Sequence, residues 1–178
     1  MMQRVTVAVV VMAVGAWGWA AHAEAQTNFS GTWVQASSGG GAAGGMGGGG
    51  RGRGMGMGGA FGERVVVTQD ATTLKATNTQ PDGTSTTFTY LLDGSESRNS
   101  VPGRQGGEPI ILVSKATWAG DKLSIATTIN LAFGGNAMTF QMTDVLSLDG
   151  DTLTVQSTRS GMRGGEPTVT VSTYKKAQ

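Results

Sequence analysis

Cysteine is absent from this chain of 178 residues, and histidine occurs only once, at position 22. The lack of cysteine excludes a disulfide framework and a lipid anchor attached to a cysteine. Charged residues make up only 14% of the chain, and the formal net charge is +1. This balance gives no attraction to nucleic acid or to an anionic membrane surface, so we expect neither as a partner.

The first residues have the pattern of a secretory signal peptide. Arg4 supplies a positive charge, and residues 5–20 form an apolar run that only Thr6, Gly15 and Gly18 interrupt. This run is shorter than the roughly 20 apolar residues of a membrane-spanning helix, and no charged flank follows it, so a retained anchor is the less favoured alternative. Ala21-His22-Ala23 and Ala23-Glu24-Ala25 both fit the small-x-small pattern of a cleavage site, and the second is favoured. The sequence thus predicts cleavage after Ala25 and a periplasmic or secreted protein without a stable membrane anchor.

The predicted mature chain, residues 26–178, has the length of a single domain. Because His22 leaves with the signal peptide, the mature protein would contain neither an imidazole nor a thiol. Within it, residues 37–62 hold 15 of the 30 glycines and almost no residue that can pack. We expect this segment to be a flexible loop rich in Gly, Met and Arg, inserted into the domain.

Most of the remaining sequence alternates between apolar and polar residues, which is typical of half-buried strands. Turn sequences such as Asp82-Gly83, Gly120-Asp121 and Asp149-Gly150 separate the runs. The pattern predicts an all-β protein, an antiparallel up-and-down meander of about eight or nine strands that closes into a barrel; a two-sheet sandwich is the alternative. The predicted inward side chains are Val65, Leu74, Phe88, Tyr90, Ile125, Leu131, Phe140, Leu146, Val155 and Val171.

The segment Phe29-Ser30-Gly31-Thr32-Trp33 resembles the Gly-x-Trp first strand of lipocalin-like (calycin-type) barrels, which is also found in small exported bacterial proteins. The resemblance implies that Trp33 closes one end of the barrel and that Lys175 or Lys176, on the last strand, covers its ring. It also implies an interior that binds a small apolar or amphipathic molecule. The simpler interpretation is that Trp33 is an ordinary core aromatic.

No catalytic centre is evident, and no cofactor is indicated. Asp82, Asp93, Asp121, Asp149 and Asp151 fall in turns, where aspartate accepts hydrogen bonds from nearby backbone amides. Serine and threonine nucleophiles would lack a histidine base. We therefore expect a protein that is not an enzyme.

Candidate ligand-binding residues come from the apolar registers and from two similar loops. Asp144 lies on an apolar register between Met142 and Leu146. It either points inward and orients a ligand, or lies at a bulge that turns it outward. The candidate set is Phe88, Tyr90, Phe140, Met142 and Asp144, together with Arg104 and Arg163 from the similar segments 103–109 and 161–167, which would form a paired rim unless similar turn chemistry alone explains them.

The glycine-rich segment offers a second, metal-based hypothesis. Met46, Met55 and Met57 lie close together in the sequence, and thioethers are soft ligands for Cu(I). The alternatives are that this segment is a spacer, or that the whole protein is a structural or protein-interaction module without a small ligand.

Overall fold

The computed structural model describes residues 26–40, 59–80, 82–103, 107–133, 136–160 and 165–177. These ranges contain ten strands and no helix, hence no helix long and apolar enough to cross a membrane. The strands are β1 (Gly31–Gly40), β2 (Arg64–Gln69), β3 (Thr73–Thr79), β4 (Ser85–Leu91), β5 (Glu96–Val101), β6 (Ile110–Ala119), β7 (Lys122–Phe133), β8 (Asn136–Asp149), β9 (Thr152–Arg159) and β10 (Thr168–Lys176).

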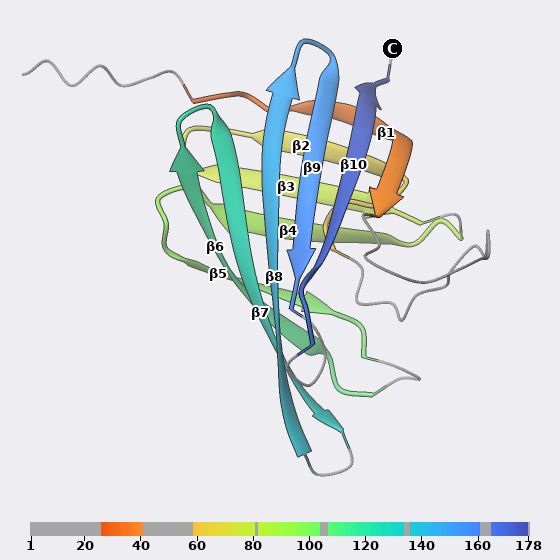
Figure 1. The fold of residues 1–178 in the computed structure, drawn as a ribbon, viewed down its shortest axis with the longest axis vertical. Coiled ribbons are helices and arrows are strands. Elements are labelled where there is room, and N and C mark those ends of the chain that lie inside the picture. Colours follow the sequence, from red (N-terminus) through yellow and green to blue (C-terminus); the bar gives the residue numbers. More distant parts are fainter. Residues whose placement is uncertain are drawn as a thin grey trace, which may run out of the picture.

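All ten strands belong to one antiparallel sheet, in the order β4-β3-β2-β1-β10-β9-β8-β7-β6-β5. The pairing of β1 with β10 joins the two ends of the chain, and β1 to β4 cross behind β7 to β10 at a steep angle (Figure 1). The predicted all-β antiparallel meander is confirmed. The predicted strand number and full closure are corrected, because the sheet has ten strands and its edges, β4 and β5, share no backbone ladder in the described residues.

Side chains of β5 close the gap between these two edge strands. Asn99 Oδ1 accepts a hydrogen bond from the Thr89 backbone N–H at 2.7 Å, and Asn99 Nδ2 donates to the Thr89 carbonyl at 3.0 Å. The Leu91 backbone N–H donates to Ser97 Oγ at 2.8 Å. We call this contact the β4–β5 seam; it satisfies backbone groups of an edge strand that a ladder would otherwise satisfy.

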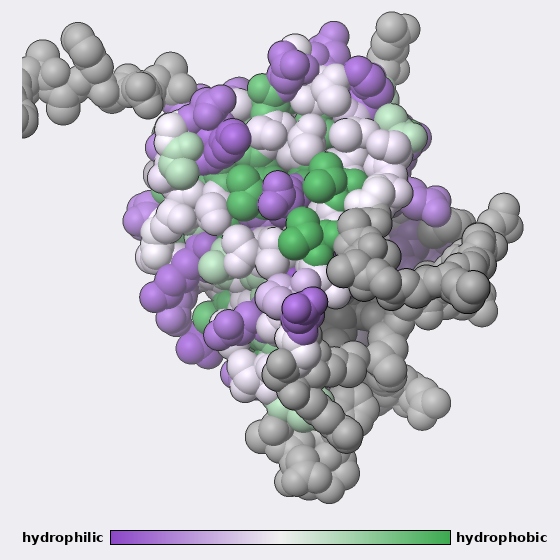
Figure 2. Space-filling view, in the orientation of Figure 1, coloured by the Kyte–Doolittle hydropathy of each residue, from purple (hydrophilic) through white to green (hydrophobic). Residues whose placement is uncertain are grey.

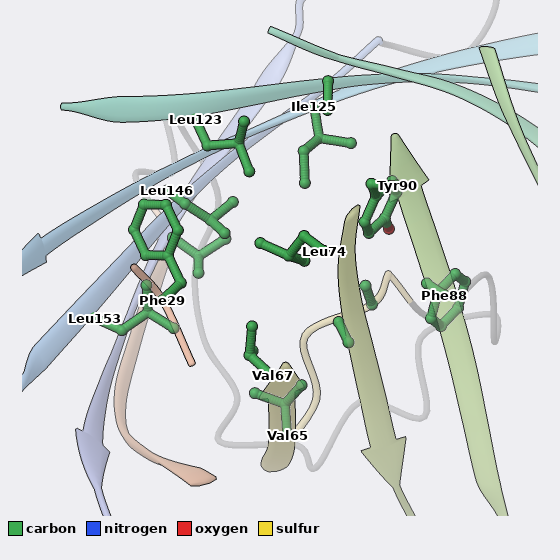
Figure 3. Packing of buried hydrophobic residues seen from close by; sticks show 14 of the residues in the cluster. Phe29, Val65, Val67, Leu74, Phe88, Tyr90, Leu123, Ile125, Leu146 and Leu153 are labelled. Atoms are coloured by element: carbon green, nitrogen blue, oxygen red, sulfur yellow. The ribbon is translucent and has the colours of Figure 1, made fainter. Parts of the chain in front are cut away.

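The core lies inside the barrel, where side chains from opposite walls meet (Figure 3). Most predicted inward residues are buried, but Leu131 and Phe140 are only half-buried, because β7 and β8 extend there beyond the ladders with β6 and β9. Val171 was predicted inward, and this is wrong: it is 40% exposed. Tyr174, three residues later, points inward instead, and the period of two then places Val171 on the outer face.

The two ends of the barrel differ. At the end that we call the Trp33 end, short connections follow β2, β4, β6 and β8, and the described chain begins and ends there. Asp93, in the connection after β4 at this end, accepts a hydrogen bond from the backbone N–H of Ser95 at 2.9 Å, as the sequence predicted. Asp82, in the connection after β3, accepts one from the backbone N–H of Thr84, also at 2.9 Å. The connections after β1, β3, β5, β7 and β9 leave the opposite end, which we call the far end.

Both ends of the predicted loop of residues 37–62 belong to the described strands and core. Ser37–Gly40 continue β1 and pair with β10. The strand therefore includes small residues that we expected to belong to the loop because they have almost no side chain to pack. At the other boundary, Ala60 is 2% exposed and Phe61 packs against the core, with its ring centroid 6.5 Å from that of Tyr174. Residues 41–58 lie outside the described residues.

The outer surface is mixed in polarity. Val34, Val66, Ile111, Val169 and Val171 are its exposed large hydrophobic residues. On the face seen in Figure 2, hydrophobic areas are interspersed with hydrophilic ones. Since this outer face offers no single hydrophobic or hydrophilic area, we look for a candidate site in the interior of the barrel.

Candidate functional site

Among the Asp and Glu side chains of the described residues, that of Asp144 is the one that is buried. The ladders of β8 with β7 and with β9 run through this position without a shift, so the bulge that would turn Asp144 outward is absent and that interpretation is wrong. The side chain keeps the inward register of Met142 and Leu146 and is 3% exposed. Ser157, directly opposite on β9, donates a hydrogen bond to Asp144 Oδ1 at 2.5 Å.

The electrostatics of Asp144 are dominated by its burial. Removal from water raises the pKa of the Asp144 carboxyl, and the hydrogen bond from Ser157 and the charge of Arg159 offset only part of this rise. Burial raises the pKa of Tyr174 to about 12 and that of Tyr90 well above its ordinary value, and the charge of Asp144 contributes to both rises. The two phenols therefore lie within the electrostatic field of Asp144 and stay neutral.

Further polar side chains continue from Asp144 around the barrel wall. Ser114 and Thr127, on neighbouring strands β6 and β7, form a buried hydrogen bond at 2.9 Å. Ser114 is also the register partner of Ser97, at the β4–β5 seam. We define the polar belt as the buried or half-buried inward residues of five consecutive strands: Ser97, Asn99, Ser114, Thr127, Asp144 and Ser157.

Apolar residues surround the polar belt. Toward the Trp33 end lie Ile125, Leu123, Leu146 and Val155, and Tyr90, Phe88 and Leu74 enter from the opposite wall (Figure 3). Toward the far end, Met142 is buried and Phe140 is half-buried. Gly59 lies beside Met142, since a Cβ at Gly59 would be 3.7 Å from the Met142 Cε. The site is thus a belt of polar groups on one side of the barrel, with apolar residues toward both ends and on the opposite wall, which suits an amphipathic ligand.

The structure brings five of the predicted ligand-binding residues, Phe88, Tyr90, Phe140, Met142 and Asp144, to the same inward-facing surface. Arg104 and Arg163 lie outside the described residues. Met46, Met55 and Met57 also lie outside the described residues. In the described ranges, no three His, Asp or Glu side chains gather in a way that could hold a metal ion.

Sequence reasoning missed Ser97, Asn99, Ser114, Thr127 and Ser157. The signal for Ser114 and Thr127 was available, because each occupies an apolar register, as Asp144 does. Ser97 and Asn99 had no such signal, since the inward face of β5 has only Val101 as an apolar residue to mark the period.

The Trp33 end is filled by aromatic residues. Trp33 is 1% exposed, and its indole N–H donates to the Phe29 carbonyl at 2.9 Å. The Phe29 ring stacks on Trp118, with 6.0 Å between centroids. Of the two candidate lysines, Lys176 has its Nζ 5.8 Å from the centroid of the Trp33 ring, whereas Lys175 donates to Thr152 Oγ1 at 2.6 Å.

The comparison with known proteins supports the fold. No family model matches the chain, and no curated protein does. Among solved structures, the crystal structure of zebrafish ileal bile acid-binding protein in complex with cholic acid is similar, with a TM-score of 0.50. The sequences are 22% identical, and the match covers 84% of this chain and 98% of that chain.

This chain thus has a β-barrel fold like that of the zebrafish protein. At 22% identity the similarity concerns the fold alone. The barrel here is an incomplete ring of ten strands, closed by the side chains of the β4–β5 seam.

Proposed function

We propose that this protein is exported and that its calycin-type barrel binds a small amphipathic molecule without catalysing a reaction. The observation that carries this proposal is the polar belt inside the barrel. A barrel that needed only a stable core would gain more from an apolar side chain at position 144, since burying a carboxyl group is costly. Polar groups between apolar walls suit a ligand that has both kinds of surface.

Two further facts support a binding function. The similar zebrafish protein was crystallised with cholic acid, so a barrel of this fold can hold a small molecule. The predicted mature chain has no His and no Cys, and Asp144 is the buried acid of the described residues, without a second carboxylate beside it. These residues suit recognition better than acid–base or nucleophilic chemistry.

The binding proposal is tested with a neutral fluorescent dye, N-phenylnaphthylamine, titrated into the protein. We expect saturable binding that Thr127→Phe abolishes, because the new ring would occupy the interior. Thr128→Phe is the matched control, since Thr128 is the next residue of β7 and faces outward. Equal dye binding by both variants, with folding checked by circular dichroism, would contradict an interior site.

Export is tested separately by the mass of the protein recovered outside the cytoplasm. Cleavage after Ala25 leaves Gln26 as the first residue. Recovery of protein that retains Met1 would contradict the proposed signal peptide.

A further inference from the structure

The positive charges of the described barrel are all exposed: Arg64, Lys75, Arg98, Lys115, Lys122, Arg159, Lys175 and Lys176. Arg159 nevertheless occupies the inward register of β9, opposite Met142, and its charge acts on Asp144. The buried ionisable groups are Asp144, Tyr90 and Tyr174, and both phenols are neutral. The buried charge of this part of the chain is therefore negative when Asp144 is ionised.

Asp144 has capacity for a further partner. An ionised carboxylate offers about four acceptor positions. Among the described residues, the hydrogen bond that Asp144 accepts comes from Ser157. Arg159, two residues beyond Ser157 on β9, lowers the pKa of Asp144 through its charge but forms no salt bridge with it. Among the described residues, the salt bridge is the one between Lys115 and Glu96. A ligand that donates hydrogen bonds and carries positive charge would complement this carboxylate.

The buried aromatic residues of the interior favour the same ligand chemistry. Tyr90 enters the interior from β4 and Tyr174 from β10, and the charge of Asp144 contributes to the raised pKa of both phenols. Aromatic faces attract cations and not anions. The apolar side chains of Ile125 and Leu146 next to the polar belt would accommodate the hydrocarbon part of such a ligand.

From these observations we infer that the barrel selects amphipathic amines, with the protonated amino group bound at Asp144, over anionic amphiphiles. This inference rests on the proposed binding function and specifies its ligand class. Cholic acid, the ligand of the similar zebrafish structure, is itself a carboxylic acid. The shared fold would thus bind a ligand of opposite charge here.

The experiment compares three probes with the same hydrocarbon chain: dodecylamine, dodecanol and dodecanoate. Each displaces N-phenylnaphthylamine from the mature protein at about pH 7, where the amine is protonated and the acid ionised. We expect dodecylamine to bind most tightly and dodecanoate most weakly. Asp144→Asn should weaken dodecylamine by about tenfold or more, since it removes a charge-assisted hydrogen bond, and should leave dodecanol nearly unchanged.

Asp149→Asn is the matched control, because it makes the same chemical change on an exposed residue of the same strand. A pH series adds a second readout. The groups that act on Asp144 are Ser157 and Arg159 from β9, and the phenols facing it come from β4 and β10. As the pH falls, Asp144 becomes protonated, so dodecylamine should lose affinity while dodecanol does not.

The outcomes separate the two proposals. If dodecanoate displaces the dye as well as dodecylamine does, or if Asp144→Asn keeps the amine preference, the amine inference is wrong and the binding function stands. If none of the three probes and no dye binds, the binding function itself is wrong. The ranking of the three probes uses the unaltered protein, so it decides the charge preference even if Asp144→Asn does not fold.

Discussion

At the residue scale, the contact between Lys176 and Trp33 depends on glycine at position 31. Gly31 has a φ of +155°, which residues with a side chain rarely adopt, and a Cβ there would be only 3.0 Å from Lys176 Cε. The glycine of the Gly-x-Trp segment therefore leaves room for the lysine stem to pass over the tryptophan ring. This gives the motif a steric reason as well as an electrostatic one.

Trp33→Ala should lower the free energy of unfolding by about 3–5 kcal/mol, the usual range for a buried tryptophan. Lys176→Met should lower it by about 1 kcal/mol, and this effect should disappear in the Trp33→Ala background, because the cation would no longer face a ring. The measurement is a double-mutant cycle by urea unfolding. Lys175→Met is the control, since its ammonium contacts Thr152, and its effect should be the same in both backgrounds.

Asp144 makes stability depend on pH in a direction opposite to that of a paired surface carboxylate. The pKa of Asp144 is higher in the folded state than the value of about 3.9 in the unfolded state. Ionisation of Asp144 therefore lowers the free energy of unfolding. This loss of stability is complete above the folded-state pKa and absent below the unfolded-state pKa. Asp144→Asn, which keeps an acceptor for Ser157, should stabilise the protein near neutral pH, and its advantage should shrink as the pH falls through the folded pKa. Urea unfolding across this range provides the measurement. An effect of Asp144→Asn that does not change with pH would contradict the burial of an ionisable carboxyl.

At the element scale, the β4–β5 seam replaces a ladder of backbone hydrogen bonds by three bonds from two side chains. Such a seam needs polar side chains that face inward, which is why the inward face of β5 carries Ser97 and Asn99. The period-two pattern therefore fails on the strand whose side chains complete the barrel. Local sequence could not reveal this, because the partners of Asn99 are backbone atoms of a different strand.

Asn99→Ala should destabilise the protein by about 1–3 kcal/mol, since it leaves the backbone N–H and C=O of Thr89 without their partners. The Thr89 amide should also exchange its hydrogen faster with solvent. Asn130→Ala is the control, because Asn130 is exposed and accepts a hydrogen bond only from Thr139 in the described structure; its cost should stay within about 0.5 kcal/mol. Equal effects of the two substitutions would show that the seam contributes little.

At the scale of the whole molecule, the class and topology of the fold could be predicted because most strands bury an apolar face and are joined by clear turn signals. The register of β10 could not, since Val169 and Val171 compete with Tyr174 for the inward position and the larger aromatic residue is the one that packs. The polar belt was foreseen only at Asp144. Ser114 and Thr127 could have been recognised from their apolar registers, whereas Ser97 and Asn99 lie on a strand whose alternation does not distinguish them from residues of a solvated face.

The segment between β1 and β2 differs along its length in what it contributes to the stability of the barrel. Removing residues 43–57 should change the melting temperature by only a few degrees, because these residues are mostly glycine and loop length contributes weakly to stability. Extending the deletion through Phe61 should cost about 2 kcal/mol or more, since Ala60 and Phe61 pack against the core and would be lost. Thermal unfolding of the two shortened proteins, compared with the parent, measures both effects. If the shorter deletion already prevents folding, the glycine-rich segment takes part in the fold; if both deletions are equally tolerated, the packing of Ala60 and Phe61 contributes nothing, and the barrel is stable on its ten strands alone.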